Sequence, residues 1–364
     1  MLHEVHTSTT GFSRSGSTFG GVAAPNTTLA ADSYVPVLKC KQGELGAIGS
    51  TAKDLLVPLV EVPSSAKAAA LAAAWLGPDV ILVQPFNLDE ADDPTWAAEV
   101  DSLFAALRGS GACAVPVATT DDGPDTVAAL GSAAATDGRG ACMRIEAEDI
   151  ALSTPAVVAG EVNQLLADLG VGANECDLVL DVGLVRSSRV ARVTAAEAGL
   201  RVLPHLADWR NLACVFSAFP ESLNDVAAKS TVTAISRDDA VSYAALLSRS
   251  PERVPLYGDY AVGTPFYVDI PWAPIPAIRY AAGLNWMIHR GATKNDRSAQ
   301  YVSLSTDVST AAHFAGAGVS AGDQYFSDVA AGLDGPGNPT TFVRAATSRH
   351  LACVLDRLAT LGVP

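Results

Sequence analysis

The chain has 364 residues and carries 39 Asp and Glu against 24 Lys and Arg, a formal net charge of −15. This acidity argues against a broad nucleic-acid surface, which requires excess positive charge, but leaves room for a local basic pocket. Hydrophobic residues make up 49% of the chain, enough for a large core. No uncharged apolar run approaches the roughly 18 residues of a membrane span, so we expect a soluble protein whose oligomeric state stays open.

The first 33 residues are rich in Ser, Thr and Gly and contain no apolar segment behind a basic start. We therefore expect residues 1–33 to be a disordered leader and not a signal peptide. The cysteines contain no CxxC pair, and several lie in apolar strand patterns, which indicates small buried side chains in a reducing cytoplasm. They are Cys40, Cys113, Cys142, Cys176, Cys214 and Cys353.

From residue 34 onward, short runs rich in Val, Ile and Leu alternate with alanine-rich stretches of helical length. This alternation is typical of βαβ units in a parallel sheet. The predicted strands are 34–39, 56–62, 79–85, 113–119, 141–147, 176–182, 212–218 and 254–260. The predicted helices are 44–53, 64–76, 95–109, 122–134, 150–169, 188–208, 221–228 and 237–249.

Eight such units in about 220 residues predict a closed (β/α)8 barrel of the TIM type over residues 34–264. An open doubly wound sheet is the alternative, but it would normally carry a GxGxxG or GxxxxGK[ST] turn after an early strand. Neither motif occurs in the chain. Dense prolines, turns and a few helices follow, so we expect residues 265–364 to form a C-terminal elaboration packed on the barrel.

Polar side chains gather at the ends of the predicted strands, and in a parallel barrel this end carries the functional site. Burying unpaired ions is costly, so these residues either form a plug of ion pairs or build a site. We interpret them as a site. The catalytic candidates are Lys39, Lys41, Glu61, Glu146, Asp181 and Asp259, and the substrate-binding candidates on the strands are Arg144, Ser217 and Tyr260.

Three chemistries fit this set, and the sequence ranks them without deciding. Glu61, Glu146, Asp181 and Asp259 could bind a divalent cation such as Mg²⁺ while Lys39, Lys41 and Arg144 hold a phosphate, as in a metal-assisted phosphoester hydrolase. A lysine and a carboxylate could instead serve as acid and base without a metal. Lys39 could also form a Schiff base with a carbonyl compound.

The C-terminal segment adds the substrate-binding candidates Arg279, Tyr280, Arg290 and His350. Arginines beside aromatic rings could bind a nucleotide or a short single strand by stacking and phosphate pairing. The alternative is that these rings attach the segment to the barrel. The chain contains neither GxSxG nor HExxH, which argues against an α/β-hydrolase triad and a zincin.

Several segments occur in an order that resembles the bacteriophage beta protein family over residues 34–358. They read YVPVLKCKQGELGAI, VPLVEVP, FSAFPESL, YGDYAVGTP, IRYAAGLNWMIHRG, SAQY, GVSAGDQY and GPGNPTTFVRAATSRH. Members of that family occur in phages and in bacterial genomes, often in regions suggestive of phage conflict. Two departures from its pattern are RYA in place of an RYT-like stretch and Ser320–Ala321 in place of an aromatic residue.

Two functions follow as hypotheses. The first is an enzyme whose barrel mouth acts on a small anionic, phosphate-bearing substrate, a nucleotide being one example. The second is a non-catalytic protein that binds or sequesters a partner in conflict between phage and host. Convergence of Lys39, Glu61, Asp259 and Arg279 on one concave pocket would favour the enzyme.

Overall fold

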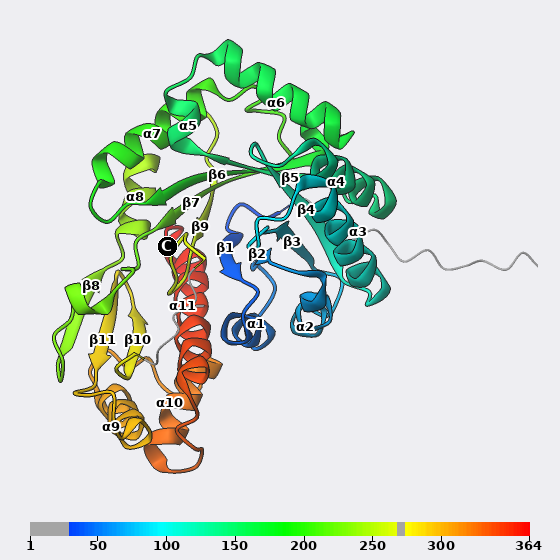
Figure 1. The fold of residues 1–364 in the computed structure, drawn as a ribbon. Helices are drawn as coiled ribbons and strands as arrows, with labels where there is room; N and C mark the ends of the chain where they lie inside the picture. Colours follow the sequence, from blue (N-terminus) through cyan, green and yellow to red (C-terminus); the bar gives the residue numbers. More distant parts are fainter. Residues whose placement is uncertain (1–28, 268–273) are drawn as a thin grey trace, which may run out of the picture.

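Eight parallel strands close into a barrel in the computed structural model, which describes residues 29–267 and 274–364 (Figure 1). Most of the expected leader, residues 1–28, lies outside the described residues. The predicted (β/α)8 barrel is confirmed, with each predicted strand contributing one barrel strand. These are β1 (Tyr34–Lys39), β2 (Leu59–Val62), β3 (Val80–Pro85), β4 (Cys113–Thr119), β5 (Ala141–Glu146), β6 (Cys176–Leu184), β7 (Asn211–Ser217) and β9 (Leu256–Asp259).

Helices cover the outside of the barrel and begin and end where the sequence provides caps. In α6, the Thr154 hydroxyl accepts a hydrogen bond from Val157 N, Pro155 occupies the first turn, and Gly170 ends the helix with a left-handed φ of 69°. No helix within the described ranges is long and apolar enough to cross a membrane. The helices before β9 are α1 (Gln42–Gly49), α2 (Ala68–Ala74), α3 (Asp93–Gly109), α4 (Pro124–Asp137), α5 (Ala147–Ala151), α6 (Pro155–Leu169), α7 (Arg189–Val202) and α8 (Asp238–Leu247).

The period-two alternation of the strands fills the barrel and points polar residues into its mouth. Val35 and Val37 of β1 belong to the interior apolar cluster, and Lys39 is the next residue on the same face. The neighbouring strand β2 has the same arrangement, with Leu59 in the interior and Glu61 at the mouth. Leu59 pairs with Val37, and Glu61 pairs with Lys39. Branched apolar layers therefore fill the barrel, and charged side chains end it.

A three-stranded antiparallel sheet lies beside the barrel and uses a strand from within the 34–264 range. β8 (Val232–Ser236) follows β7 in the chain but pairs with β11 (Asn285–Arg290), which pairs in turn with β10 (Ala277–Ala282). The helix predicted at 221–228 is reduced to a short 3-10 turn at Leu223–Asp225.

The C-terminal segment contributes helices, the last of which completes the barrel wall. They are α9 (Arg297–Thr310), α10 (Ala321–Ala331) and α11 (Pro339–Leu361). The long α11 packs between α1 and β10, as the red helix of Figure 1 shows. Its Leu351 and Val354 share one core cluster with Tyr34 and Tyr257 on the outer face of β1 and β9. This helix therefore covers the place where the eighth helix of a barrel is expected.

A buried polar cluster around Asp259 joins the barrel, the segment after β8 and α11. The Asp259 carboxylate accepts hydrogen bonds from the Tyr34 hydroxyl, from Tyr257 at 2.8 Å, from Arg237 at 3.2 Å and from His350 Nε2 at 2.8 Å. None of the five residues is more than 1% exposed. Burial alone would raise the pKa of Asp259, but His350 and Arg237 hold it well below its usual range.

Replacing Asp259 with Asn should lower the free energy of unfolding by about 3–5 kcal/mol at pH 7, because it removes one of the two carboxylate charges that Arg237 faces and the charge that His350 bonds to. The folded-state pKa of Asp259 is depressed, so its contribution is complete above the unfolded-state pKa of about 4 and is lost as the pH falls below that value. Urea denaturation at pH 7 and pH 3 measures both effects. Asp101→Asn, on the exposed side of α3, is the control and should change little. A small effect of Asp259→Asn at pH 7 would contradict the structural role of this cluster.

Candidate functional site

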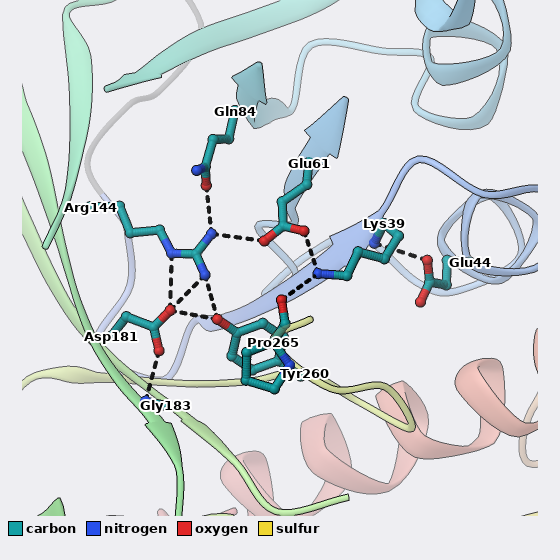
Figure 2. A network of polar contacts seen from close by, with 9 residues as sticks. All are labelled: Lys39, Glu44, Glu61, Gln84, Arg144, Asp181, Gly183, Tyr260 and Pro265. Carbon is teal, nitrogen blue, oxygen red and sulfur yellow. Dashed lines mark hydrogen bonds and ion pairs between the residues drawn. The ribbon is translucent and has the colours of Figure 1, made fainter. Parts of the chain in front are cut away.

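Arg144 of β5 lies at the centre of the barrel mouth and is surrounded by acceptors, as Figure 2 shows. A guanidinium has five N–H donors, and all five are used here. Two go to Asp181 Oδ2 at 3.0 and 2.6 Å. Nη1 donates two more hydrogen bonds, to Glu61 at 2.9 Å and to Gln84 at 2.6 Å. Nη2 donates the fifth to the Tyr260 hydroxyl. Arg144 thus holds together residues from β2, β3, β6 and the end of β9.

Lys39 extends this network toward β1. Its ammonium donates to the second oxygen of Glu61 and, at 3.0 Å, to the carbonyl of Pro265 in the loop after β9. Lys39 is 7% exposed and Glu61 1%. Two cations, Lys39 and Arg144, therefore face two carboxylates, Glu61 and Asp181, and the group is neutral overall. Both contacts occupy the Lys39 amine, which would have to leave them to attack a carbonyl compound and form a Schiff base.

A bulge in β6 places Asp181 against Arg144. The pairing register between β6 and β7 shifts between Asp181 and Gly183, where φ is 69°, a conformation that suits glycine. Gly183 N donates to Asp181 Oδ1 at 2.9 Å, while the Tyr260 hydroxyl donates to Oδ2. Burial, with Asp181 and Glu61 nearby, raises the pKa of Tyr260 well above its usual range despite Arg144. Tyr260 is therefore a neutral donor.

A cavity of about 430 Å³ opens above this network at the carboxyl ends of the strands. Glu61, Arg144, Asp181 and Tyr260 line it. The other charged lining residues are Asp121, Asp122, Glu146, Glu148 and Arg192. Because Glu148 pairs with Arg192 at 2.6 Å, and the central network is neutral, the excess charge of the cavity is negative.

Glu146 is one of two cavity carboxylates, with Asp121, whose side chains have no bonded partner among the described residues. It ends β5, is exposed, and has no hydrogen bond or ion pair to another residue of the described ranges. Burial raises its pKa, and the charges of Asp181 and Asp149 raise it further. Burial likewise raises the pKa of Asp122, which accepts a hydrogen bond from Thr119 N at 2.7 Å. Two carboxyl groups with raised pKa values therefore face one cavity.

The magnesium set expected from the sequence is not brought together. Within the described ranges, no three His, Cys, Asp or Glu side chains are close enough to hold a metal ion. Glu61 and Asp181 are bonded to Lys39 and Arg144, and Asp259 lies on another face of the barrel.

The expected placement of Asp259 and His350 at the mouth needs correction. Tyr260 points into the barrel, so the residue before it, Asp259, points outward, where His350 of α11 bonds to it. Trp286 donates to His350 Nδ1 at 3.2 Å, which leaves the proton on Nε2 for Asp259. Both residues therefore belong to the structural cluster described above.

The remaining candidates are dispersed. The ammonium of Lys41 lies 4.5 Å from the ring centre of Tyr267, and Ser217 is buried at the end of β7 with no hydrogen-bond partner for its hydroxyl among the described residues. The Tyr280 hydroxyl donates to Asp323 at 2.7 Å within the C-terminal segment. Arg279 and Arg290 line a second cavity, outside the mouth.

Some site residues were missed by the sequence-based selection. Asp121 and Asp122 follow β4 directly, and this position after a barrel strand could have identified them. Gln84 lies next to the last residue of β3 and was not selected as a candidate from the sequence. Glu44, in the first turn of α1, accepts a hydrogen bond from Lys39 N at 2.9 Å, and burial raises its pKa to about 7 although Lys39 and Lys41 lower it.

The fold and the cavity define a parallel (β/α)8 barrel with a charged pocket at the carboxyl ends of its strands. The chain belongs to the Beta protein family, whose sequence profile matches residues 34–356. A search of curated proteins found no match. Among solved structures, triosephosphate isomerase from Bartonella henselae is similar at 12% identity and a TM-score of 0.33, covering 62% of this chain and 92% of that one. The barrel assignment here rests on the strand order.

Replacing Arg144 with Met should lower the free energy of unfolding by about 3–5 kcal/mol, because Glu61 and Asp181 would lose a buried counter-charge. Urea denaturation at pH 7 measures the change. Arg201→Met is the matched control, since Arg201 is 74% exposed and pairs with Glu197 on the surface of α7, and it should have little effect. Equal stability of the two variants would show that the network does not hold the mouth together.

Proposed function

We propose that the protein is an enzyme that uses acid–base catalysis in the mouth cavity, on a small substrate with hydroxyl or amine groups. The observation that supports this most is Glu146, a carboxyl group with a raised pKa and no bonded partner among the described residues, in a cavity that it lines together with the network of Arg144, two residues earlier on β5. A general acid must hold its proton near the working pH, and a raised pKa favours that state.

The side chains divide into proton-transfer and positioning groups in this proposal. Glu146 donates a proton to the substrate, and Asp122, whose pKa is also raised, is the second proton-transfer group. Arg144 uses all its donors within the protein, so it positions Asp181 and Tyr260 instead of binding the substrate. Such a rigid wall reduces the reorganisation needed when a substrate binds.

The charge of the cavity supports a different substrate class from the one expected. A phosphate-bearing substrate was expected, but Lys39 and Arg144 are already bonded to Glu61 and Asp181. Binding phosphate there would require displacing a carboxylate or bringing in a cation. The excess of carboxylates favours neutral hydroxyl groups or amines, which can donate hydrogen bonds to them.

The second hypothesis, a protein that binds or sequesters a partner without catalysis, is favoured by two observations. Asp259 and Arg279 do not converge with Lys39 and Glu61 on one pocket. The central network is neutral and fully bonded, as a structural plug would be. A role in conflict between phage and host accompanies either hypothesis, and it is supported by the resemblance to bacteriophage proteins alone.

A screen of hydroxyl- and amine-bearing metabolites by thermal shift separates the two hypotheses. Ligands of the mouth should stabilise the wild type by linkage but not Thr120→Trp, which fills the cavity from an exposed lining position. If no compound distinguishes the two proteins, the non-catalytic hypothesis is supported instead.

For a compound that is turned over, Glu146→Gln should lower kcat by about 100-fold or more and change its Kd little, because it removes the proton donor but keeps the shape. The kcat of the wild type should fall as the pH rises through the raised pKa of Glu146, since only the protonated form can donate. Glu161→Gln, on the exposed side of α6, is the control. Full turnover by Glu146→Gln would exclude Glu146 as the general acid.

A further inference from the structure

A second cavity, of about 310 Å³, lies between the end of β7, the sheet of β10 and β11, and the first turns of α9 and α11. We call it the arginine pocket. Its charged lining residues are Arg279, Arg290, Lys294 and Glu221, and its rings are Tyr301 and Phe342. None of its lining residues also lines the mouth cavity, so the two sites are distinct.

Among the described residues, no carboxylate lies within ion-pair distance of the cations of the arginine pocket. No residue of the described ranges forms an ion pair with Arg279, Arg290 or Lys294. The buried arginines elsewhere do have one: Arg144 pairs with Asp181, Arg210 with Asp177 and Arg237 with Asp239. The arginine pocket therefore differs in kind from the charge networks that stabilise the barrel.

The two arginines are held in place by neutral acceptors and keep donors for a ligand. Arg290 is only 6% exposed and donates to the carbonyls of Leu223 and Ala227 and to the Asn224 side chain. Arg279 donates only to the Val262 carbonyl, at 3.0 Å, and its guanidinium lies 4.8 Å from the ring centre of Phe219. Each guanidinium has five N–H donors, of which Arg290 uses three and Arg279 one. None of the remaining donor nitrogen atoms is both buried and without a partner.

No carboxylate of the described residues forms an ion pair with these cations. Burial lowers the pKa of Arg279, although the charge of Glu44 nearby raises it. Glu221 offsets one of the three cations from the exposed rim, so the lining carries an excess of two positive charges. Unpaired charge of this kind is costly to bury, and an anion that carries two negative charges would balance it.

The rings indicate what else the ligand carries. Tyr301 and Phe342 are stacked with their ring centres 3.8 Å apart, and both are buried residues of the pocket lining. Guanidinium groups match the geometry of phosphate oxygens, and aromatic walls suit a flat apolar group. We propose that the arginine pocket binds an organic phosphate, with the phosphate at Arg279, Arg290 and Lys294 and the apolar part beside Tyr301 and Phe342.

Titration calorimetry of the full chain with phenyl phosphate, AMP and inorganic phosphate tests this proposal. The organic phosphates should bind, inorganic phosphate should bind more weakly because it lacks the apolar part, and phenol should not bind. Lys294→Glu should weaken binding of the organic phosphates by at least about tenfold through charge reversal, and raising the salt concentration should also weaken it. Lys294 is exposed and makes no hydrogen bond or ion pair with another described residue, so this variant should fold.

Lys229→Glu is the matched control, because Lys229 is an exposed lysine outside the pocket, and it should bind the probes as the wild type does. Thr120→Trp should also bind them normally, which separates this site from the mouth and from the function proposed there. The proposal is overturned if none of the three phosphates binds, or if Lys294→Glu binds like Lys229→Glu. Loss of binding in Thr120→Trp would overturn it too, by placing the phosphate in the mouth. Equal binding of benzoate would contradict the choice of phosphate.

Discussion

The saturation of Arg144 by five acceptor contacts is the constraint on which the mouth of this barrel depends. A guanidinium is planar, and its donors point in fixed directions, so its partners must come from defined places. Here they come from four different strands or strand ends, which meet only because the sheet closes. One side chain thus connects the closure of the fold to the shape of the site. Removing its partners would leave a buried charge, which makes the arrangement sensitive to substitution.

The charges of the molecule fall into three groups with different consequences. Around Asp259 and in the mouth, buried ions of opposite sign are hydrogen-bonded to one another, which gives defined structure and little capacity to bind. Above the mouth network, Glu146 and the other lining carboxylates without an ion pair among the described residues give the mouth cavity an excess of negative charge. Arg279 and Arg290 give the arginine pocket an excess of positive charge, although the chain as a whole is acidic. Net charge therefore says little about what each site would attract.

The barrel could be predicted from the sequence because each strand carries its own local signal. Apolar runs separated by alanine-rich helices identify the eight strands, and the polar residues that end them include Lys39, Glu61, Arg144 and Asp181. The position of Asp259 could not be predicted in the same way. It stands next to Tyr260, and only the register of the closed sheet decides which of two consecutive residues points inward.

The contacts between the C-terminal segment and the barrel also could not be predicted from local sequence patterns. α11 covers β9 and β1 through contacts between residues far apart in the chain, such as His350 with Asp259. Likewise, β8 resembles any short strand, and its pairing with β11 outside the barrel depends on tertiary contacts. The arginine pocket arises from this same assembly, since its walls come from the loop after β7 and from β10, β11, α9 and α11. Arg279 and Arg290 were candidates from the sequence, but a sequence cannot show that no carboxylate of the described residues pairs with them.

A double-mutant cycle between Arg144 and Asp181 tests most directly whether the mouth is one bonded unit. Arg144→Met, Asp181→Ala and the double variant would be compared by urea denaturation at pH 7. The double variant should be more stable than the sum of the single losses predicts, by about 2 kcal/mol or more, because each single change leaves the other charge buried and unpaired. Losses that add to within about 0.5 kcal/mol would show that the two side chains act independently, and this would contradict the account.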